Sequence, residues 1–267
     1  RSCAAARQAA VQALCPGSDI AALLDKPNNN LAVEYCKAII EQNVEMQPIA
    51  LPRQGADHGQ ALTESAHAAF ASASALRALW AEGGAAALAP YVPQKALKLY
   101  KQAEYDGKYT DFAVMGHCEL ALLRAACAEQ APFAAVRGVS EGLEHRLENA
   151  VRETASLPAL LDALTTVRYP RARMRRLAMD AALGYTAQTP ALPPYLHLLG
   201  ARKEALPLPG ETALPLSHSL ARLARENETC AQMAAAQSRA SDLGALCRAK
   251  PEPMGGIYRQ KIIFLTN

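Results

Sequence analysis

Apolar residues recur at the three- and four-residue spacing of α-helices along most of this 267-residue chain. Residues 47–51 are instead a short apolar run that predicts a buried strand, and a second short apolar strand is predicted at the C-terminal end. Polar loops are predicted over 100–111 and from 184, the latter leading into a short helix. Helices are predicted over residues 2–14, 19–24, 31–43, 75–80, 111–128, 141–183 with breaks, 214–227 and 228–249.

Residues 141–183 carry the strongest pattern and predict two helices that flank a shorter one. Pro170 suits the first turn of the last helix, where its missing N–H has no hydrogen bond to lose. From this start, apolar residues fall on one face, so most of the intervening arginines must point elsewhere. The apolar positions are Met174, Leu177, Ala178, Ala181 and Ala182.

Five arginines gather within nine residues around the start of this last helix. The planar guanidinium fork binds phosphate bidentately, and a polyanion would relieve the mutual repulsion of the five charges. A solvated helix face remains the alternative interpretation on composition alone. The predicted polyanion-binding residues are Arg168, Arg171, Arg173, Arg175 and Arg176.

The pattern EGLEHR followed by TVRYPRARMRR resembles the C-terminal helical domain of the bacterial tRNA(Met) cytidine acetate ligase family, within the nucleotidylyltransferase superfamily. The resemblance extends over nearly the whole chain. It implies that the five arginines bind tRNA, and that ATP and acetate are the other substrates.

Two N-terminal segments fit the nucleotide site of that family. PNNNLAVEYCKA is similar to a family segment in which an asparagine contacts ATP, and Asn29 is the matching residue, although Ala32 replaces the family's glycine. On the residues alone, the asparagines also fit a helix cap. Arg53 follows the predicted strand, and in the family a basic residue at this place contacts the nucleotide. His58 lies in the loop beyond and is not assigned a role.

The segment SASALR resembles the superfamily's phosphate-binding motif. Ser72 and Ser74 precede a predicted helix and Arg77 lies one turn into it, so hydroxyls, free N–H groups and a cation would meet at the helix start. A simple N-cap is the alternative interpretation. The predicted ATP-binding residues are therefore Asn29, Arg53, Ser72, Ser74 and Arg77.

Composition adds little to the predicted function. The formal net charge is +3, and arginine outnumbers lysine by 19 to 9 within the total of 28. Seven cysteines form no C-x-x-C pair and the histidines are not clustered, so we expect reduced thiols and no metal site made by the protein. His117 and Cys118 lie within the helix predicted over 111–128, and we expect them to be part of the protein core. The absence of a long apolar run predicts no membrane association and a cytoplasmic protein.

The superfamily's His-x-Gly-His motif does not occur in these residues, and the chain opens on Arg1 as if inside an element. We therefore expect the catalytic histidines upstream of residue 1. The predicted fold is α/β plus all-α: residues 1–85 form part of a Rossmann-like nucleotidylyltransferase lobe, and residues 86–267 form a helical tRNA-binding domain.

By resemblance, the intact protein would join ATP and acetate into acetyl-adenylate and acetylate the wobble cytidine of elongator tRNA(Met) to N4-acetylcytidine, with Mg²⁺ accompanying the triphosphate. The 267-residue chain alone is expected to be inactive. Two alternatives stay open: a nucleotidylyltransferase that acts on a small molecule, and a non-catalytic RNA-binding relative.

Overall fold

The computed structural model describes residues 3–17, 19–24, 26–51, 71–202, 204 and 212–265. It divides into two compact units, Arg1–Ala75 and Leu76–Asn267. The predominantly helical fold predicted from the sequence is confirmed. The predicted division at residue 85 separates functions, a catalytic lobe and a tRNA-binding domain, and it stays a prediction.

The first unit begins with three helices close to their predicted positions: α1 (Cys3–Leu14), α2 (Ile20–Leu23) and α3 (Pro27–Glu41). Pro27 occupies the first turn of α3, where proline is tolerated. Ala21 and Leu24 of the α2 segment are buried, whereas Tyr35 and Ile40 on α3 are exposed. The described part of this unit therefore has a small core.

The strand predicted over residues 47–51 is wrong. Residues 44–51 run on from α3 with neither helix nor strand, and Ile49 and Leu51 are more than four-fifths exposed. A strand needs a neighbour for its backbone N–H and C=O groups, and within the described ranges none pairs with this segment. The apolar run alone was insufficient evidence for a strand.

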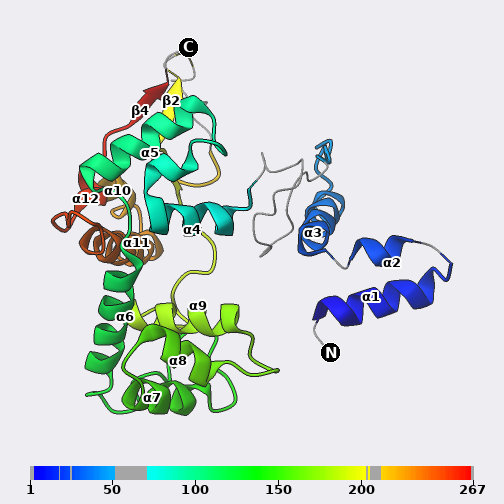
Figure 1. The fold of residues 1–267 in the computed structure, drawn as a ribbon, viewed down its shortest axis with the longest axis horizontal. Coiled ribbons are helices and arrows are strands. Elements are labelled where there is room, and N and C mark those ends of the chain that lie inside the picture. Colours follow the sequence, from blue (N-terminus) through cyan, green and yellow to red (C-terminus); the bar gives the residue numbers. More distant parts are fainter. Residues whose placement is uncertain are drawn as a thin grey trace. The chain divides into compact units, whose positions relative to one another are not determined.

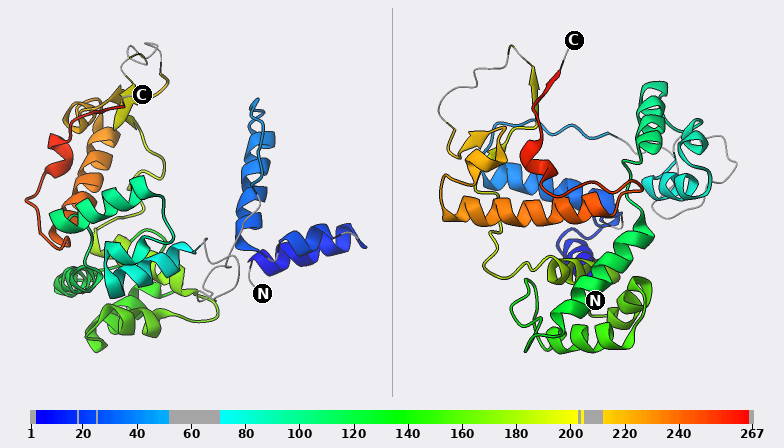
Figure 2. Two further views of the ribbon diagram at one scale, coloured as in Figure 1. Left: turned by 45° about the horizontal axis from the view of Figure 1, so that its top comes forward. Right: turned by 90° about the vertical axis from the view of Figure 1, so that its left-hand side faces the viewer.

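The second unit holds most of the helices. Figure 1 shows α6 running from the α4 and α5 region towards a group made by α7, α8 and α9, and the right-hand view of Figure 2 shows the same arrangement. Its helices are α4 (Ala73–Gly83, begun in the first unit), η1 (Ala85–Leu88), α5 (Gln94–Asp106), α6 (Phe112–Ala126), α7 (Leu143–Glu153), α8 (Leu157–Leu164), α9 (Arg171–Ala182), α10 (Leu220–Leu223), α11 (Glu228–Leu246) and α12 (Gly256–Arg259).

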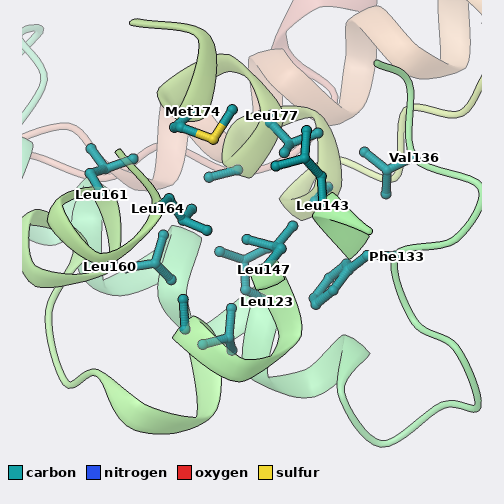
Figure 3. Close-up of a cluster of buried hydrophobic side chains, with 14 of the residues drawn as sticks. Leu123, Phe133, Val136, Leu143, Leu147, Leu160, Leu161, Leu164, Met174 and Leu177 are labelled. Atoms are coloured by element: carbon teal, nitrogen blue, oxygen red, sulfur yellow. The ribbon is translucent and has the colours of Figure 1, made fainter. Parts of the chain in front are cut away.

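The main core lies among α6, α7, α8 and α9. Leu123, Leu147, Leu160, Leu164 and Met174 are fully buried, one or two from each helix, and their side chains gather in Figure 3. Each sits on the apolar face of its helix, and the inward position predicted for Met174 from the helical spacing is confirmed. This core fixes the segment 141–183 and with it the start of α9.

Two corrections concern the ends of this unit. The predicted loop over 100–111 begins too early, because α5 continues to Asp106 and ends at Gly107, whose φ of 68° suits glycine at a helix C-terminus. The predicted short helix after residue 184 does not form. That region instead contributes β1 (Leu196–His197) and β2 (Gly200–Arg202), which pair in parallel with β3 (Leu216–Ser217) and β4 (Ile263–Leu265) respectively.

Trp80 joins α4 to the α5 region. Its ring lies 5.6 Å from that of Tyr100 in an edge-to-face arrangement, and 5.7 Å from that of Tyr109. Both separations are within the range of favourable aromatic pairs, which add about 0.5 to 1.5 kcal/mol beyond burial. The three rings therefore hold α4 against α5 and the loop that follows.

Asp111 should make a measurable contribution to stability as the cap of α6. Its Oδ1 accepts hydrogen bonds from the N–H groups of Ala113 at 2.9 Å and Val114 at 3.1 Å. Loss of such a cap costs about 1 kcal/mol. We expect Asp111→Ala to lower the free energy of unfolding of the second unit by about this amount in urea titrations, while Asp111→Asn, which keeps an acceptor, loses much less. Equal midpoints for Asp111→Ala and the parent would contradict the assignment.

Candidate functional site

The start of α9 is organised by packing on its opposite face. Met174, Leu177, Ala178 and Ala181 are buried, as the sequence predicted, and α9 packs on α6 and α8. The arginines are consequently turned outward: Arg171, Arg175 and Arg176 are exposed and Arg173 is half-buried, while Arg168 is exposed in the preceding turn.

Tyr169 positions two of the five guanidinium groups. The Arg173 guanidinium lies 5.1 Å and that of Arg168 5.7 Å from the centre of the tyrosine ring. Both are within the range of a cation–π contact. The ring itself is buried, and its hydroxyl donates to the Glu141 carboxylate at 3.2 Å. Tyr169 was not singled out from the sequence, although its place between an arginine and a proline was the available signal.

Two carboxylates pair with the arginines. Glu141 forms an ion pair with Arg168, and Asp162 forms one with Arg171. Glu141 adopts a left-handed backbone with φ of 56°, which is uncommon for a residue other than glycine. All four side chains are substantially exposed, and exposed ion pairs contribute only about 0 to 1 kcal/mol. An incoming phosphate can therefore replace either carboxylate at little cost.

Glu119 is on α6, the helix that packs against α9. It is almost fully buried, and no group in the described part of the chain makes a hydrogen bond to its Oε1. Burial raises the pKa of this carboxyl to about 7, and the charge of Arg175 partly opposes the rise. A glutamate in a helical segment ordinarily indicates a solvated face, so the burial of Glu119 cannot be predicted from the local pattern.

Arg176 is the least constrained of the five. It is exposed and forms no ion pair or hydrogen bond within the described part of the chain. Arg173 likewise has no carboxylate partner there. Arg175 has no ion pair there either, so the cluster presents three guanidiniums without an ion pair in the described ranges beside two weakly paired ones, an arrangement suited to several phosphates in a row.

The start of α4 holds Ser72 and Ser74. The Ser72 hydroxyl accepts from the N–H of Ala75 at 3.2 Å and lies 3.0 Å from the Ser74 hydroxyl, and Ser72 is buried. Ser72 is thus an N-cap, while Ser74 lies inside the first turn instead of ahead of it. Arg77 follows on the same helix and is exposed.

The remaining predicted site residues are only partly covered. Asn29 is half-buried near the start of α3, and its neighbour Asn30 donates to the Leu24 carbonyl at 2.6 Å, as a local cap. Arg53 and His58 lie outside the described residues. The core role predicted for His117 is wrong: the side chain is exposed, and its Nδ1 lies 2.8 Å from the Ala113 carbonyl oxygen.

A sequence profile described as HIGH nucleotidyl transferase matches residues 1–254. The chain belongs to this nucleotidyl transferase family. Among curated relatives, the tRNA(Met) cytidine acetate ligase of Listeria monocytogenes strain EGD-e is 30% identical over 186 residues, covering 68% of this chain and 45% of the relative. The protein of the same name from Geobacillus sp. strain WCH70 is 29% identical over 185 residues, covering 66% of this chain and 45% of the relative.

Two solved structures have a similar fold. Thermotoga maritima TmcAL, in an apo crystal, superposes with a TM-score of 0.81 at 19% identity, covering 98% of this chain and 66% of that one. The same protein bound with alpha-thio ATP gives a TM-score of 0.81 and 19% identity, covering 100% of this chain and 67% of that one. The resemblance inferred from EGLEHR and TVRYPRARMRR is confirmed.

This nucleotidyl transferase chain spans about 45% of the length of the curated relatives it matches. Within the described ranges, no helix combines the length and apolarity needed to cross a membrane. Over the same ranges, no three His, Cys, Asp or Glu side chains gather in a way that could hold a metal ion.

Proposed function

We propose that the intact protein is an ATP-dependent ligase that acetylates a cytidine of tRNA. In the first step, an acetate oxygen attacks the α-phosphate of ATP and pyrophosphate leaves, which forms acetyl-adenylate. In the second, the N4 amine of the wobble cytidine of elongator tRNA(Met) attacks the acetyl carbonyl, AMP leaves, and N4-acetylcytidine results. The names of the curated relatives support this proposal.

The observation that carries the proposal for this chain is the guanidinium cluster at the start of α9. We assign tRNA binding to Arg168, Arg171, Arg173, Arg175 and Arg176, which are turned outward by a buried face of the same helix. Backbone phosphates are bound by such clusters, and the affinity that results depends strongly on salt. The alternative of a small-molecule nucleotidylyltransferase would leave the cluster without a role.

ATP is assigned to the N-terminal segments. Asn29, Ser72, Ser74 and Arg77, together with Arg53, are the proposed contacts, and the solved structure of T. maritima TmcAL bound with alpha-thio ATP supports nucleotide binding in this fold. Mg²⁺ would be held mainly by the oxygens of the triphosphate and by water, as is usual for this ion. No residue of the described ranges is assigned to it.

Binding of tRNA and release of AMP can be tested separately on this chain. We expect the 267-residue protein to bind tRNA(Met) in a filter assay but to release no AMP from ATP in the presence of acetate and tRNA. The reason is that these residues contain no His-x-Gly-His motif to stabilise the charge that develops on the phosphates. A version that carries such a segment upstream should release AMP. If the 267-residue chain released AMP as fast as the longer version, the assignment of the chemistry to an upstream motif would be wrong. If the chain failed to bind tRNA, the assignment of tRNA binding to α9 would be wrong.

A further inference from the structure

A second feature of the second unit plays no part in the proposed chemistry. A cavity of about 430 Å³ lies between α11 and the segment that runs from Tyr185 to β1. Its volume is within the range of small-molecule sites, which are concave, mostly apolar and equipped with a few fixed polar groups. Its lining includes Arg137, Tyr185, Tyr195, His197, Gln237 and Ala240.

His197 brings an unused hydrogen-bond acceptor to this lining. Its Nε2 lies 3.2 Å from the backbone carbonyl oxygen of His218, and since a carbonyl can only accept, Nε2 carries the proton. Nδ1 of the neutral ring is then an acceptor. That atom is covered by other atoms of the chain and has no hydrogen-bond partner among the residues that the structure describes. A buried polar atom left unsatisfied in this way is unusual and calls for a partner.

Gln237 supplies the complementary group. Its Oε1 accepts the hydroxyl proton of Tyr195 at 2.8 Å, which fixes the orientation of the side-chain amide. Nε2, with two N–H donors, makes no hydrogen bond to another residue of the described ranges. The lining therefore offers one free acceptor and one free donor, both on side chains held by a second hydrogen bond.

A cation is fixed at the same cavity. Arg137 donates from Nε and Nη2 to the two carboxylate oxygens of Asp180 at 3.1 and 2.9 Å, and its guanidinium lies 5.4 Å from the centre of the Tyr185 ring. The Tyr185 hydroxyl is anchored on the Ala236 carbonyl at 2.9 Å. The guanidinium is exposed, and its remaining Nη1 faces no described partner, so it can still bind an anion.

We propose that this cavity binds a nucleobase together with its phosphate, supplied by an unpaired nucleotide of RNA. A base edge carries a donor next to an acceptor, which matches the free Nδ1 of His197 and the free amide N–H groups of Gln237. Tyr185, which also has the guanidinium of Arg239 6.0 Å from its ring centre, and the small exposed part of Tyr195 supply the aromatic surface against which a base packs. Arg137 supplies the charge for the phosphate. A free mononucleotide offers the same chemistry and is distinguished by the test. The inference rests on the proposed function only in its choice of RNA as the source.

The test compares two cavity variants with a matched control. Gln237→Leu removes the free donor together with the acceptor of the Tyr195 hydroxyl, and Ala240→Trp fills the cavity without removing any hydrogen-bonding side chain. Gln232→Leu makes the first change at an exposed position of the same helix outside the cavity. Affinity for tRNA(Met) is measured by filter binding between 50 and 200 mM salt, and affinity for CMP and AMP by calorimetry, after circular dichroism has shown that each variant is folded.

We expect both cavity variants to bind tRNA roughly 5- to 100-fold more weakly, the range for losing one stacked and recognised base. The salt slope should fall by no more than the roughly 0.7 to 0.9 of one phosphate contact, the contact of Arg137, because the phosphates along α9 are still bound. Gln232→Leu should match the parent. Loss of CMP or AMP binding with unchanged tRNA binding would place a free nucleotide in the cavity and overturn RNA as the source. Parental affinity of both cavity variants for every ligand would overturn the site itself.

The two proposals fail in different ways. If the parent chain does not bind tRNA, the proposed function fails, while the cavity is still tested by CMP and AMP. If the parent binds tRNA and only the arginine variants weaken it, the function stands and the cavity proposal falls.

Discussion

Replacement of Arg168, Arg173 and Arg176 by alanine together will weaken tRNA binding and flatten its dependence on salt. Each lost phosphate contact lowers the slope of log K against log salt by roughly 0.7 to 0.9, so the triple variant should lose roughly 2 to 3 units of slope. The affinity should fall by roughly 100-fold or more at low salt, because a hydrogen bond to a charged group contributes about 1.5 to 3 kcal/mol.

The structure suggests how to separate charge from folding in this experiment. Arg176→Ala removes a side chain with no described partner and should weaken binding without changing the urea midpoint. Arg168→Ala also unpairs Glu141 and removes one cation from the Tyr169 ring, so a small loss of stability is expected as well. Three exposed arginines elsewhere, Arg222, Arg225 and Arg259, provide a control of equal charge. If that control weakened binding as much as the α9 variant, binding would depend on net charge and not on the cluster.

Stability should fall as pH rises from about 4.5 to about 7, because of Glu119. The pKa of this carboxyl is raised from 4.5 to about 7 in the folded protein, chiefly by burial. A raised pKa stabilises the folded state below 4.5, where the carboxyl is protonated in both states, and this contribution is lost as pH rises through 7. A shift of this size corresponds to something on the order of 3 kcal/mol.

Glu119→Gln isolates this contribution. The amide has the same shape and no titration, so the variant should lose on the order of 3 kcal/mol less than the parent between pH 5 and pH 8 in urea titrations. Histidines and other carboxyls titrate alike in both proteins and cancel in the difference. Glu129→Gln, a change at an exposed position, should reproduce the parent. Parallel pH profiles for Glu119→Gln and the parent would mean that Glu119 is ionised in the folded protein throughout.

The sequence predicted the parts of this fold that are set by periodicity. Met174 and Leu177 follow each other at helical spacing on α9, and Leu147 lies on the apolar face of α7. A helix with a long apolar face must pack that face against other helices to bury it. The same reasoning predicts that the arginines of α9 point outward, as they do in the structure. That α9 bears a charged surface therefore followed from local pattern alone.

Three failures share a different cause, because each depends on residues distant in sequence. Ile49 and Leu51 form an apolar run, but a strand depends on a partner. The local pattern around His197 predicts a loop that leads into a short helix, whereas His197 belongs to strand β1, which pairs in parallel with β3 at Ser217. The burial of Glu119 depends on α9 packing over it. The residues assigned to ATP, Asn29, Arg53, Ser72, Ser74 and Arg77, remain predictions.

The packing of Trp80 has a practical consequence. It is the single tryptophan of the chain, and the rings of Tyr100 and Tyr109 lie within 6 Å of it. Intrinsic fluorescence excited selectively at tryptophan therefore comes from one known place, helix α4, which Ser72 caps and which carries Arg77. A nucleotide bound at that helix start, or a loosening of α4 from α5, would each alter the emission of a single fluorophore without any label having been introduced.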